Sequence, residues 1–249
     1  MDTRIIAVLL IDRGRAVVTN CFGRRHYIGD PRNIARIFSE QECDELIIKN
    51  ISGSELSKGD FQLITEICGE CTMPVGYGGN IGTVEIAKAV VECGADKIVL
   101  NRAYRRKEEW INRFADAYGE QALIASIDYR ISSANRLVYE WKSGTTTRMS
   151  LESYLRELQA MPVGEILLSC VDLDGTRRGL DSEILGETLE SLQKPLILNG
   201  GAGSELEIVE LTDTEKLSGI GVGTYFALGT TGFGVSVDIP LSLRRSKLR

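Results

Sequence analysis

The chain has 249 residues, 43% of them hydrophobic, and a formal net charge of -6 at pH 7. A chain of this length can bury a full core as one unit, so we expect residues 1–249 to form a single domain. The acidic balance argues against a nucleic acid or a membrane surface as the main partner. No apolar run approaches the roughly 18 residues of a membrane span, and the N-terminus lacks the layout of a secretion signal, so we expect a cytoplasmic protein.

The cysteines and the histidine limit the possible metal chemistry. His26 is the only histidine, which excludes a multi-histidine metal site. Cys68 and Cys71 form a C-x-x-C pair, but Cys68 lies on the same apolar stripe as Ile64 and Ile67. A reduced core thiol is therefore favoured over a metal or redox pair, and we expect neither a metal nor a cofactor.

Apolar runs bounded by turn residues alternate with helical periodicity along the whole chain. The expected strands are Ile5–Ile11, Glu45–Lys49, Met73–Gly76, Lys97–Leu100, Ala122–Ile127, Glu165–Cys170, Leu196–Leu198 and Gly219–Val222. Helical patterns lie near residues 31–41, 59–70, 83–92, 106–117, 149–160, 181–192, 204–211, and finally 225–230 or 238–246. Eight strand-to-helix units in a chain of this size favour an α/β fold of the closed (β/α)8 TIM-barrel type. An open doubly wound sheet is the alternative, although no G-x-G-x-x-G follows the first strand.

The two halves of the chain resemble each other. Residues 43–54 correspond to residues 163–175, and residues 9–18 correspond to residues 125–141. Two Gly-Gly turns also correspond, one at Gly78-Gly79 and one at Gly200-Gly201. A half-barrel repeat of this kind predicts a two-fold arrangement of sites at the barrel mouth.

Each Gly-rich turn joins a short apolar strand to a helical pattern. Such turns expose backbone N–H groups that can bind a phosphate. The other interpretation is that the glycines only permit a tight strand-to-helix connection, and the sequence leaves both open.

In TIM barrels the carboxyl ends of the strands carry the active site. That face combines carboxylates, amides, hydroxyls and Gly-rich turns: Leu10 or Asp12, Asn50, Ser52, Gly78, Gly79, Asn80, Asn101, Asp128, Ser169, Asp172, Asp174, Gly175, Asn199, Gly200, Gly201, Gly223 and Thr224. This set suits a phosphorylated polar substrate and acid–base catalysis, with Asp128 at the end of an apolar strand. The alternatives are a loop-capping role for Asp128 and turn-forming roles for Asp172 and Asp174.

The segments RIIAVLLIDRGRAVV, YIGDP, DELIIKNISGS, GADKIVLNRA, IASIDYR, GEILLSCVDLDGTRRGLD and NGGAGS together resemble the HisF-like cyclase subunit of imidazole glycerol phosphate synthase. The resemblance covers nearly the whole chain. It implies a lyase-type synthase that works with a glutaminase partner. Ammonia from glutamine would travel through the barrel to a bis-phosphorylated substrate, where two aspartates act as general acid and base.

Matching the family residues one by one gives a mixed result at the mouth. The second catalytic aspartate falls on Asp128, but the first falls on Leu10, which cannot transfer a proton. Asp12 lies two residues further on, roughly 6–7 Å along the strand, and a bulge would be needed to bring it into the site. We therefore carry Asp128 and Asp12 as the candidate catalytic pair.

Other family positions at the mouth are also altered. The family's downstream lysine has no counterpart at Val18 or Thr19, and its aspartate on strand two is Asn50. Asn80 replaces the third glycine of one phosphate turn, and Arg102 replaces a small hydroxyl residue. The other phosphate turn, with Gly175, Gly201 and Thr224, keeps the family pattern.

The opposite end of the barrel matches the family fully. There the family has a ring of charges at its ammonia entrance, and its members fall on Arg4, Glu45, Lys97 and Glu165. The resemblance implies an ammonia gate; a structural layer of salt bridges is the alternative.

The leucine run in strand one and Tyr27-Ile28-Gly29-Asp30-Pro31 resemble a divergent branch of the family associated with acetamidino sugar biosynthesis. That resemblance implies delivery of ammonia for modifying a sugar of a surface polysaccharide, together with a separate ATP-dependent amidotransferase. The histidine-pathway cyclase and a non-catalytic ammonia conduit remain alternatives. A related sugar-isomerase barrel is a weaker one, because an isomerase uses no ammonia.

Overall fold

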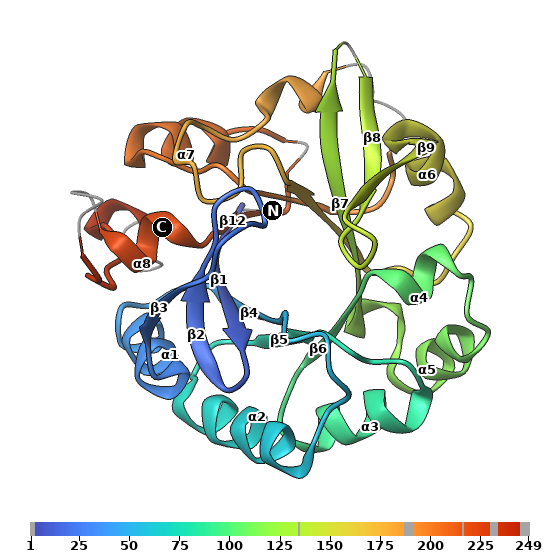
Figure 1. Ribbon diagram of the computed structural model, residues 1–249, viewed down its shortest axis with the longest axis horizontal. Helices are drawn as coiled ribbons and strands as arrows, with labels where there is room; N and C mark the ends of the chain where they lie inside the picture. The colour runs from blue at the N-terminus through green and yellow to red at the C-terminus, as the bar shows by residue number, and fades with distance from the viewer. Residues whose placement is uncertain (1–2, 134, 187–191, 216, 230–233, 245–249) are drawn as a thin grey trace.

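The structure is a computed structural model that describes residues 3–133, 135–186, 192–215, 217–229 and 234–244. Eight parallel strands form a closed barrel with helices around it (Figure 1). The barrel strands are β1 (Arg4–Asp12), β4 (Glu45–Asn50), β5 (Val75–Gly78), β6 (Lys97–Leu100), β7 (Leu123–Ser132), β10 (Glu165–Cys170), β11 (Leu196–Asn199) and β12 (Gly219–Val222). The barrel closes because β10 pairs with both β7 and β11 and β12 pairs with β1.

Helices connect successive barrel strands on the outside. They are α1 (Pro31–Glu40), α2 (Lys58–Glu70), α3 (Val84–Glu92), α4 (Arg102–Arg105), α5 (Trp110–Tyr118), α6 (Leu151–Leu158), α7 (Glu205–Thr212) and α8 (Thr224–Leu228), with 3-10 segments at Glu120–Ala122, Ser182–Leu185 and Leu241–Leu243. Local sequence fixes several of their starts. Ser57 and Asp60 form a reciprocal capping box at the start of α2, and Asp30 caps α1 just before Pro31. Within the described residues, no helix is long and apolar enough to cross a membrane.

The predicted barrel is confirmed, and all eight expected strands are present. Three of them, Lys97–Leu100, Glu165–Cys170 and Gly219–Val222, have the predicted bounds, and the other five have shifted ends. The helix expected at 106–117 starts only at Trp110, because Lys107 has a φ of 53° that ends the preceding helical turn. The helix expected at 181–192 is a 3-10 segment over Ser182–Leu185, and residues 187–191 lie outside the described part. Of the two candidates for the last helix, α8 matches 225–230, whereas 238–246 holds a short 3-10 segment and extends beyond the described residues.

Two antiparallel extensions of the barrel were not predicted. β1 continues into a hairpin with β2 (Arg15–Val18), which pairs in turn with β3 (His26–Gly29). β7 continues in the same way into β8 (Asn135–Glu140), which pairs with β9 (Thr145–Ser150). Because β1 and β7 are the first and fifth barrel strands, the two extensions follow the half-barrel correspondence between residues 9–18 and 125–141.

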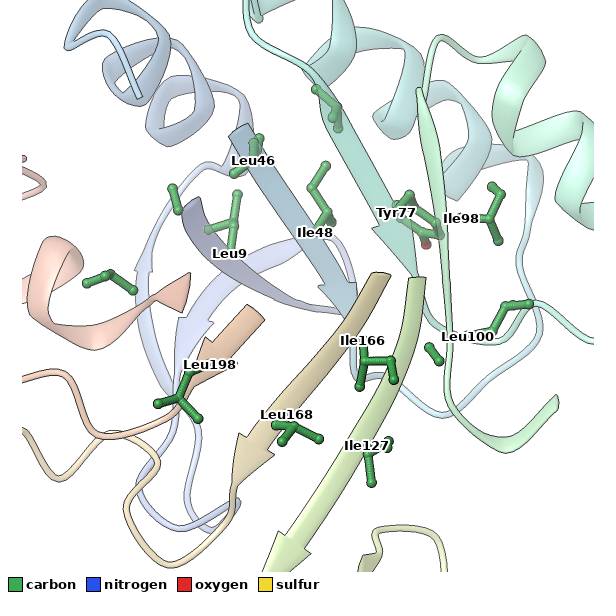
Figure 2. Close-up of a cluster of buried hydrophobic side chains, with 14 of the residues drawn as sticks. Leu9, Leu46, Ile48, Tyr77, Ile98, Leu100, Ile127, Ile166, Leu168 and Leu198 are labelled. Atoms are coloured by element: carbon green, nitrogen blue, oxygen red, sulfur yellow. The ribbon is translucent and has the colours of Figure 1, made fainter. Parts of the chain in front are cut away.

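Side-chain alternation along the strands divides the core into two clusters. The outer cluster lies between barrel and helices, and Figure 2 shows part of it, including Leu46 and Ile48 of β4. The inner cluster fills the middle of the barrel: Ile6, Val8, Ile47, Val99, Ile124, Leu167 and Ile197, with Leu10 packed against it. The lumen is therefore apolar between its two ends, and the polar residues of each strand lie at those ends.

Candidate functional site

A cavity of about 730 Å³ lies at the carboxyl ends of the barrel strands. Most of the predicted site residues line it: Leu10, Asn50, Gly78, Gly79, Asn80, Asn101, Asp128, Asp174, Gly175, Asn199, Gly200, Gly201, Gly223 and Thr224. The structure thus brings the predicted carboxylates, amides and Gly-rich turns into one cavity. Four of the predicted mouth residues do not line it: Asp12, Ser52, Ser169 and Asp172.

Asp128 lies near the middle of β7 and is only 6% exposed. Asn101 Nδ2 donates a hydrogen bond of 2.9 Å to its Oδ2. Burial raises the pKa of Asp128; Lys49 opposes this rise and Asp174 adds to it. The carboxyl group therefore keeps its proton to a higher pH than an ordinary aspartate, as suits a group that both donates and accepts protons.

Asp174 is a second buried carboxylate of the cavity. Thr19 Oγ1 donates to its Oδ2 at 2.6 Å, and burial raises its pKa although this hydrogen bond opposes the rise. The next residue, Gly175, has a φ of +69°, and a Cβ there would lie 1.8 Å from the Thr19 carbonyl oxygen. Only glycine fits at this point, where the loop after β10 crosses the segment after β2.

The second Gly-rich turn is equally restricted. Gly201 has a φ of +112°, and a Cβ on it would lie 2.0 Å from the carbonyl oxygen of Gly179. The steric interpretation therefore explains this glycine without a ligand, and phosphate binding stays a prediction.

At the other turn, which contains Gly78 and Gly79, Asn80 Nδ2 is buried without a hydrogen-bond partner among the described residues. A donor of this kind on the cavity wall suits an oxygen-rich ligand.

Leu10, and not Asp12, faces the cavity on β1. The register between β1 and β2 runs evenly from Leu10 opposite Val17 to Asp12 opposite Arg15, so no bulge in β1 returns Asp12 to the site. Its Oδ1 instead lies 2.7 Å from Nη1 of Arg25. Asp12 therefore lies in the hairpin and reaches the cavity only through Arg25, which lines it, so this geometry does not support the predicted catalytic role of Asp12.

Ser169 was also predicted to contact substrate, but it is fully buried beneath the cavity. Its Oγ accepts hydrogen bonds from Lys49 Nζ at 3.0 Å and from Asn199 Nδ2 at 3.1 Å. Lys49 itself lines the cavity and was missed by the sequence analysis. The signal was present, because Glu45, Ile47 and Lys49 alternate along β4 and must share its lumen face.

Four charged residues form a closed ring at the amino ends of the strands. Arg4 forms ion pairs with both Glu45 and Glu165. Lys97 Nζ lies 3.0 Å from Glu45 Oε1 and 2.7 Å from Glu165 Oε2. Each cation therefore bridges both carboxylates, and two charges of each sign make the ring neutral.

The two carboxylates of the ring differ in environment. Burial raises the pKa of Glu45, which is 1% exposed, against the opposing effects of Lys97 and Arg4. Burial also acts to raise the pKa of Glu165, but Arg4 and Lys97 outweigh it and hold that pKa below its ordinary value. The ring thus depends on both cations to keep its carboxylates charged.

The C-x-x-C pair has the environment expected of packing thiols. Cys68 and Cys71 are partly buried against the outer core cluster. Burial raises the pKa of Cys68 to about 11 and that of Cys71 to about 12. Both thiols therefore stay protonated at neutral pH and are poor nucleophiles.

The raised pKa of Asp128 predicts a pH-dependent effect of Asp128→Asn on stability. The folded state binds more protons than the unfolded state between the ordinary aspartate pKa and the raised value, so wild-type stability falls as pH rises through this window. Asp128→Asn removes this loss. Urea unfolding from pH 4 to pH 8 should show that the free energy of unfolding of Asp128→Asn, relative to that of the wild type, increases with pH. Asp116→Asn, at an exposed site on α5, should show no such increase. A constant or shrinking advantage would contradict the buried-carboxylate interpretation.

Lys97→Met should break the charged ring and leave Glu45 buried with one cation fewer. Removing one partner of a buried ion pair costs about 3–5 kcal/mol. Lys194→Met is the matched control, since Lys194 pairs at 3.0 Å with an exposed Glu120, and such pairs contribute about 0–1 kcal/mol. Denaturant unfolding of both variants measures the difference, and equal losses would show that the ring is not a buried network.

The sequence is similar to those of known proteins over nearly its whole length. The family model described as "Histidine biosynthesis protein" matches residues 4–231. A putative imidazole glycerol phosphate synthase subunit hisF2 of Pseudomonas aeruginosa is 34% identical over 240 residues, which are 95% of each chain. A putative subunit hisF3 of Vibrio vulnificus is 32% identical over 99% of this chain and 96% of that protein. The imidazole glycerol phosphate synthase subunit HisF of Chlorobium phaeobacteroides is 35% identical over 81% of this chain and 80% of that protein. The chain therefore belongs to the histidine biosynthesis protein family and, within it, to the HisF-like subunits of imidazole glycerol phosphate synthase.

Proposed function

We propose that this chain is the ammonia-accepting synthase subunit of a glutamine amidotransferase system, and that it does not catalyse the cyclase reaction of histidine biosynthesis. One observation carries the proposal: the charged ring at the amino end of the barrel is complete, whereas Leu10 occupies the cavity where the cyclase family carries its first catalytic aspartate.

The amino end of the barrel suits the entry of ammonia from a glutaminase partner. The ring is neutral as a whole and its cations also lie partly exposed, at 27% for Arg4 and 18% for Lys97. Above it, the apolar inner cluster fills the middle of the lumen. Entry into an apolar interior costs neutral ammonia less desolvation free energy than ammonium, so this interior favours passage of the reactive species. The complete ring also favours this function over a sugar isomerase.

The mouth supports proton transfer by one carboxylate. Ammonia that adds to a carbon bearing an oxygen leaving group becomes a substituted ammonium and must lose a proton as that group departs. Asp128 can take this proton, since its ionised form is held by Asn101 and its pKa is raised by burial. Its retention favours a subunit with chemistry of its own over a passive ammonia conduit.

The substrate we propose is a sugar whose N-acetyl group becomes an acetamidino group, in the pathway of a surface polysaccharide. A separate ATP-dependent amidotransferase would activate the amide oxygen before ammonia attacks. The leucine run of β1 and the YIGDP segment support this branch, and Leu10 in the cavity is consistent with it. A phosphorylated group of the substrate would occupy the turns at Gly200, Gly201 and Thr224, which line the same cavity.

The histidine-pathway cyclase is the competing function, and complementation separates the two. Loss of one general acid or base costs about 10²–10⁴ in rate. The chain should therefore fail to restore growth of a cyclase-deficient histidine auxotroph, whereas the HisF subunit of Chlorobium phaeobacteroides, expressed in parallel, serves as the positive control. Growth at the control's rate would overturn the proposal.

A further inference from the structure

Lys49 is a cation inside the barrel mouth that neither the ring nor the carboxylate chemistry uses. It lies one residue before the end of β4, on the lumen face shared with Glu45 and Ile47. In the β1–β4 ladder its direct neighbour is Leu10. The strand that lacks a catalytic carboxylate is thus next to a strand that supplies an ammonium group at the same level.

The contacts of Lys49 leave part of its hydrogen-bonding capacity unused. Its Nζ donates to Ser169 Oγ at 3.0 Å, and Asn199 Nδ2 donates to the same oxygen at 3.1 Å. Across the described ranges, no carboxylate lies within ion-pair distance of Lys49. An ammonium group has three N–H donors, so two of them have no protein acceptor there.

The nearby carboxylates are engaged elsewhere. Asp128 accepts from Asn101, and Asp174 accepts from Thr19. Both lie close enough to Lys49 for its charge to lower their pKa values against the effect of burial. The cavity floor therefore has a cationic side at Lys49 that is distinct from its two hydrogen-bonded carboxylates.

This arrangement is unfavourable for stability alone. Lys49 is half-buried and has no ion-pair partner within hydrogen-bond distance among the described residues, whereas an apolar side chain here would extend the inner cluster. Ser169 is fully buried and accepts from the ammonium group, and Asn199, which is 7% exposed, fixes the Ser169 hydroxyl. Lys49 lines the cavity, so its remaining donors are available to a ligand there.

We propose that Lys49 is a substrate-contacting residue that binds an oxyanion, the phosphate or carboxylate of a small-molecule substrate, on the floor of the mouth. Ser169 and Asn199 act as positioning residues for its ammonium group. The site uses a side-chain cation and not the backbone N–H groups of the Gly-rich turns. It stands whether or not ammonia passes through the barrel, because anion binding requires neither glutaminase nor glutamine.

The test is NMR of the full chain with 15N-labelled lysine side chains, titrated separately with inorganic phosphate and with acetate. Loss of one signal in Lys49→Met assigns Lys49 Nζ. We expect a saturable shift of this signal, whereas Lys88 Nζ, on the exposed side of α3, should drift weakly and linearly. A tighter response to phosphate assigns a phosphoryl group to the site, and a tighter response to acetate assigns a carboxylate. The Lys88→Met control should leave the Lys49 titration unchanged.

Two further measurements could contradict the proposal: the titration of Ser169→Ala and the backbone amide signals of Gly200 and Gly201. Ser169→Ala should weaken the anion affinity measured at Lys49 Nζ about tenfold, while the backbone amide signals of Gly200 and Gly201 keep their own response to phosphate. If those glycine amides respond and Lys49 Nζ shows no saturable shift with either anion, the proposal is wrong. Failure of the ammonia function would leave the Lys49 titration as expected, so the two results are distinguishable.

Discussion

The strict alternation of side chains along a closed parallel barrel is the constraint on which the other features depend. In β4 it places Glu45, Ile47 and Lys49 on one line inside the lumen, from the ring to the mouth. In β10 it does the same for Glu165, Leu167 and Ser169. Because all eight strands run the same way, charge at their amino ends, apolar bulk in the middle and polar groups at their carboxyl ends become three layers of one packed interior.

The two ends of this interior differ in how their polar residues are held. At the amino end, four charges on β1, β4, β6 and β10 satisfy one another, so changing any single one leaves a buried charge without full compensation. At the mouth the polar residues are joined only in small separate sets, such as Asn101 with Asp128 and Thr19 with Asp174. Leu10 beside Lys49 shows how the carboxyl end can exchange one kind of group for another without disturbing the strand pairing. This difference is consistent with the proposed function, in which the charged ring is kept while the chemistry at the mouth differs from that of the cyclase.

Much of the fold was predictable because the local pattern of apolar and polar residues differs between strands, helices and turns. Strands such as Glu165–Cys170 and Lys97–Leu100 are short apolar runs between turn residues, and their predicted bounds are those of the structure. β9 was missed because its sequence TTTRMS is polar and largely exposed, so it lacks the alternation that marks a half-buried strand.

The site was predictable only in part, because its details depend on register between distant segments. Asp12 is two residues from Leu10 and so points to the same face of β1. The hairpin with β2, however, places its carboxylate against Arg25 and not on the cavity wall. Ser169 was assigned to the right strand end but is covered by Lys49 and Asn199. The family resemblance identified the four residues of the ring. That each cation contacts both carboxylates could not be predicted from the sequence, because it depends on how four distant strands are placed in the barrel.

The most direct test of the account is cyclase turnover by the purified chain, with ammonium chloride at alkaline pH as the nitrogen source and the bis-phosphorylated ribulosyl compound of the histidine pathway as substrate. Ammonium salt bypasses the glutaminase, so a mismatch between partners cannot obscure the result. The account predicts no turnover above that of Asp128→Asn, because Leu10 supplies no proton. Turnover at the rate of a HisF control, abolished by Asp128→Asn, would contradict it and identify the chain as a working histidine-pathway cyclase.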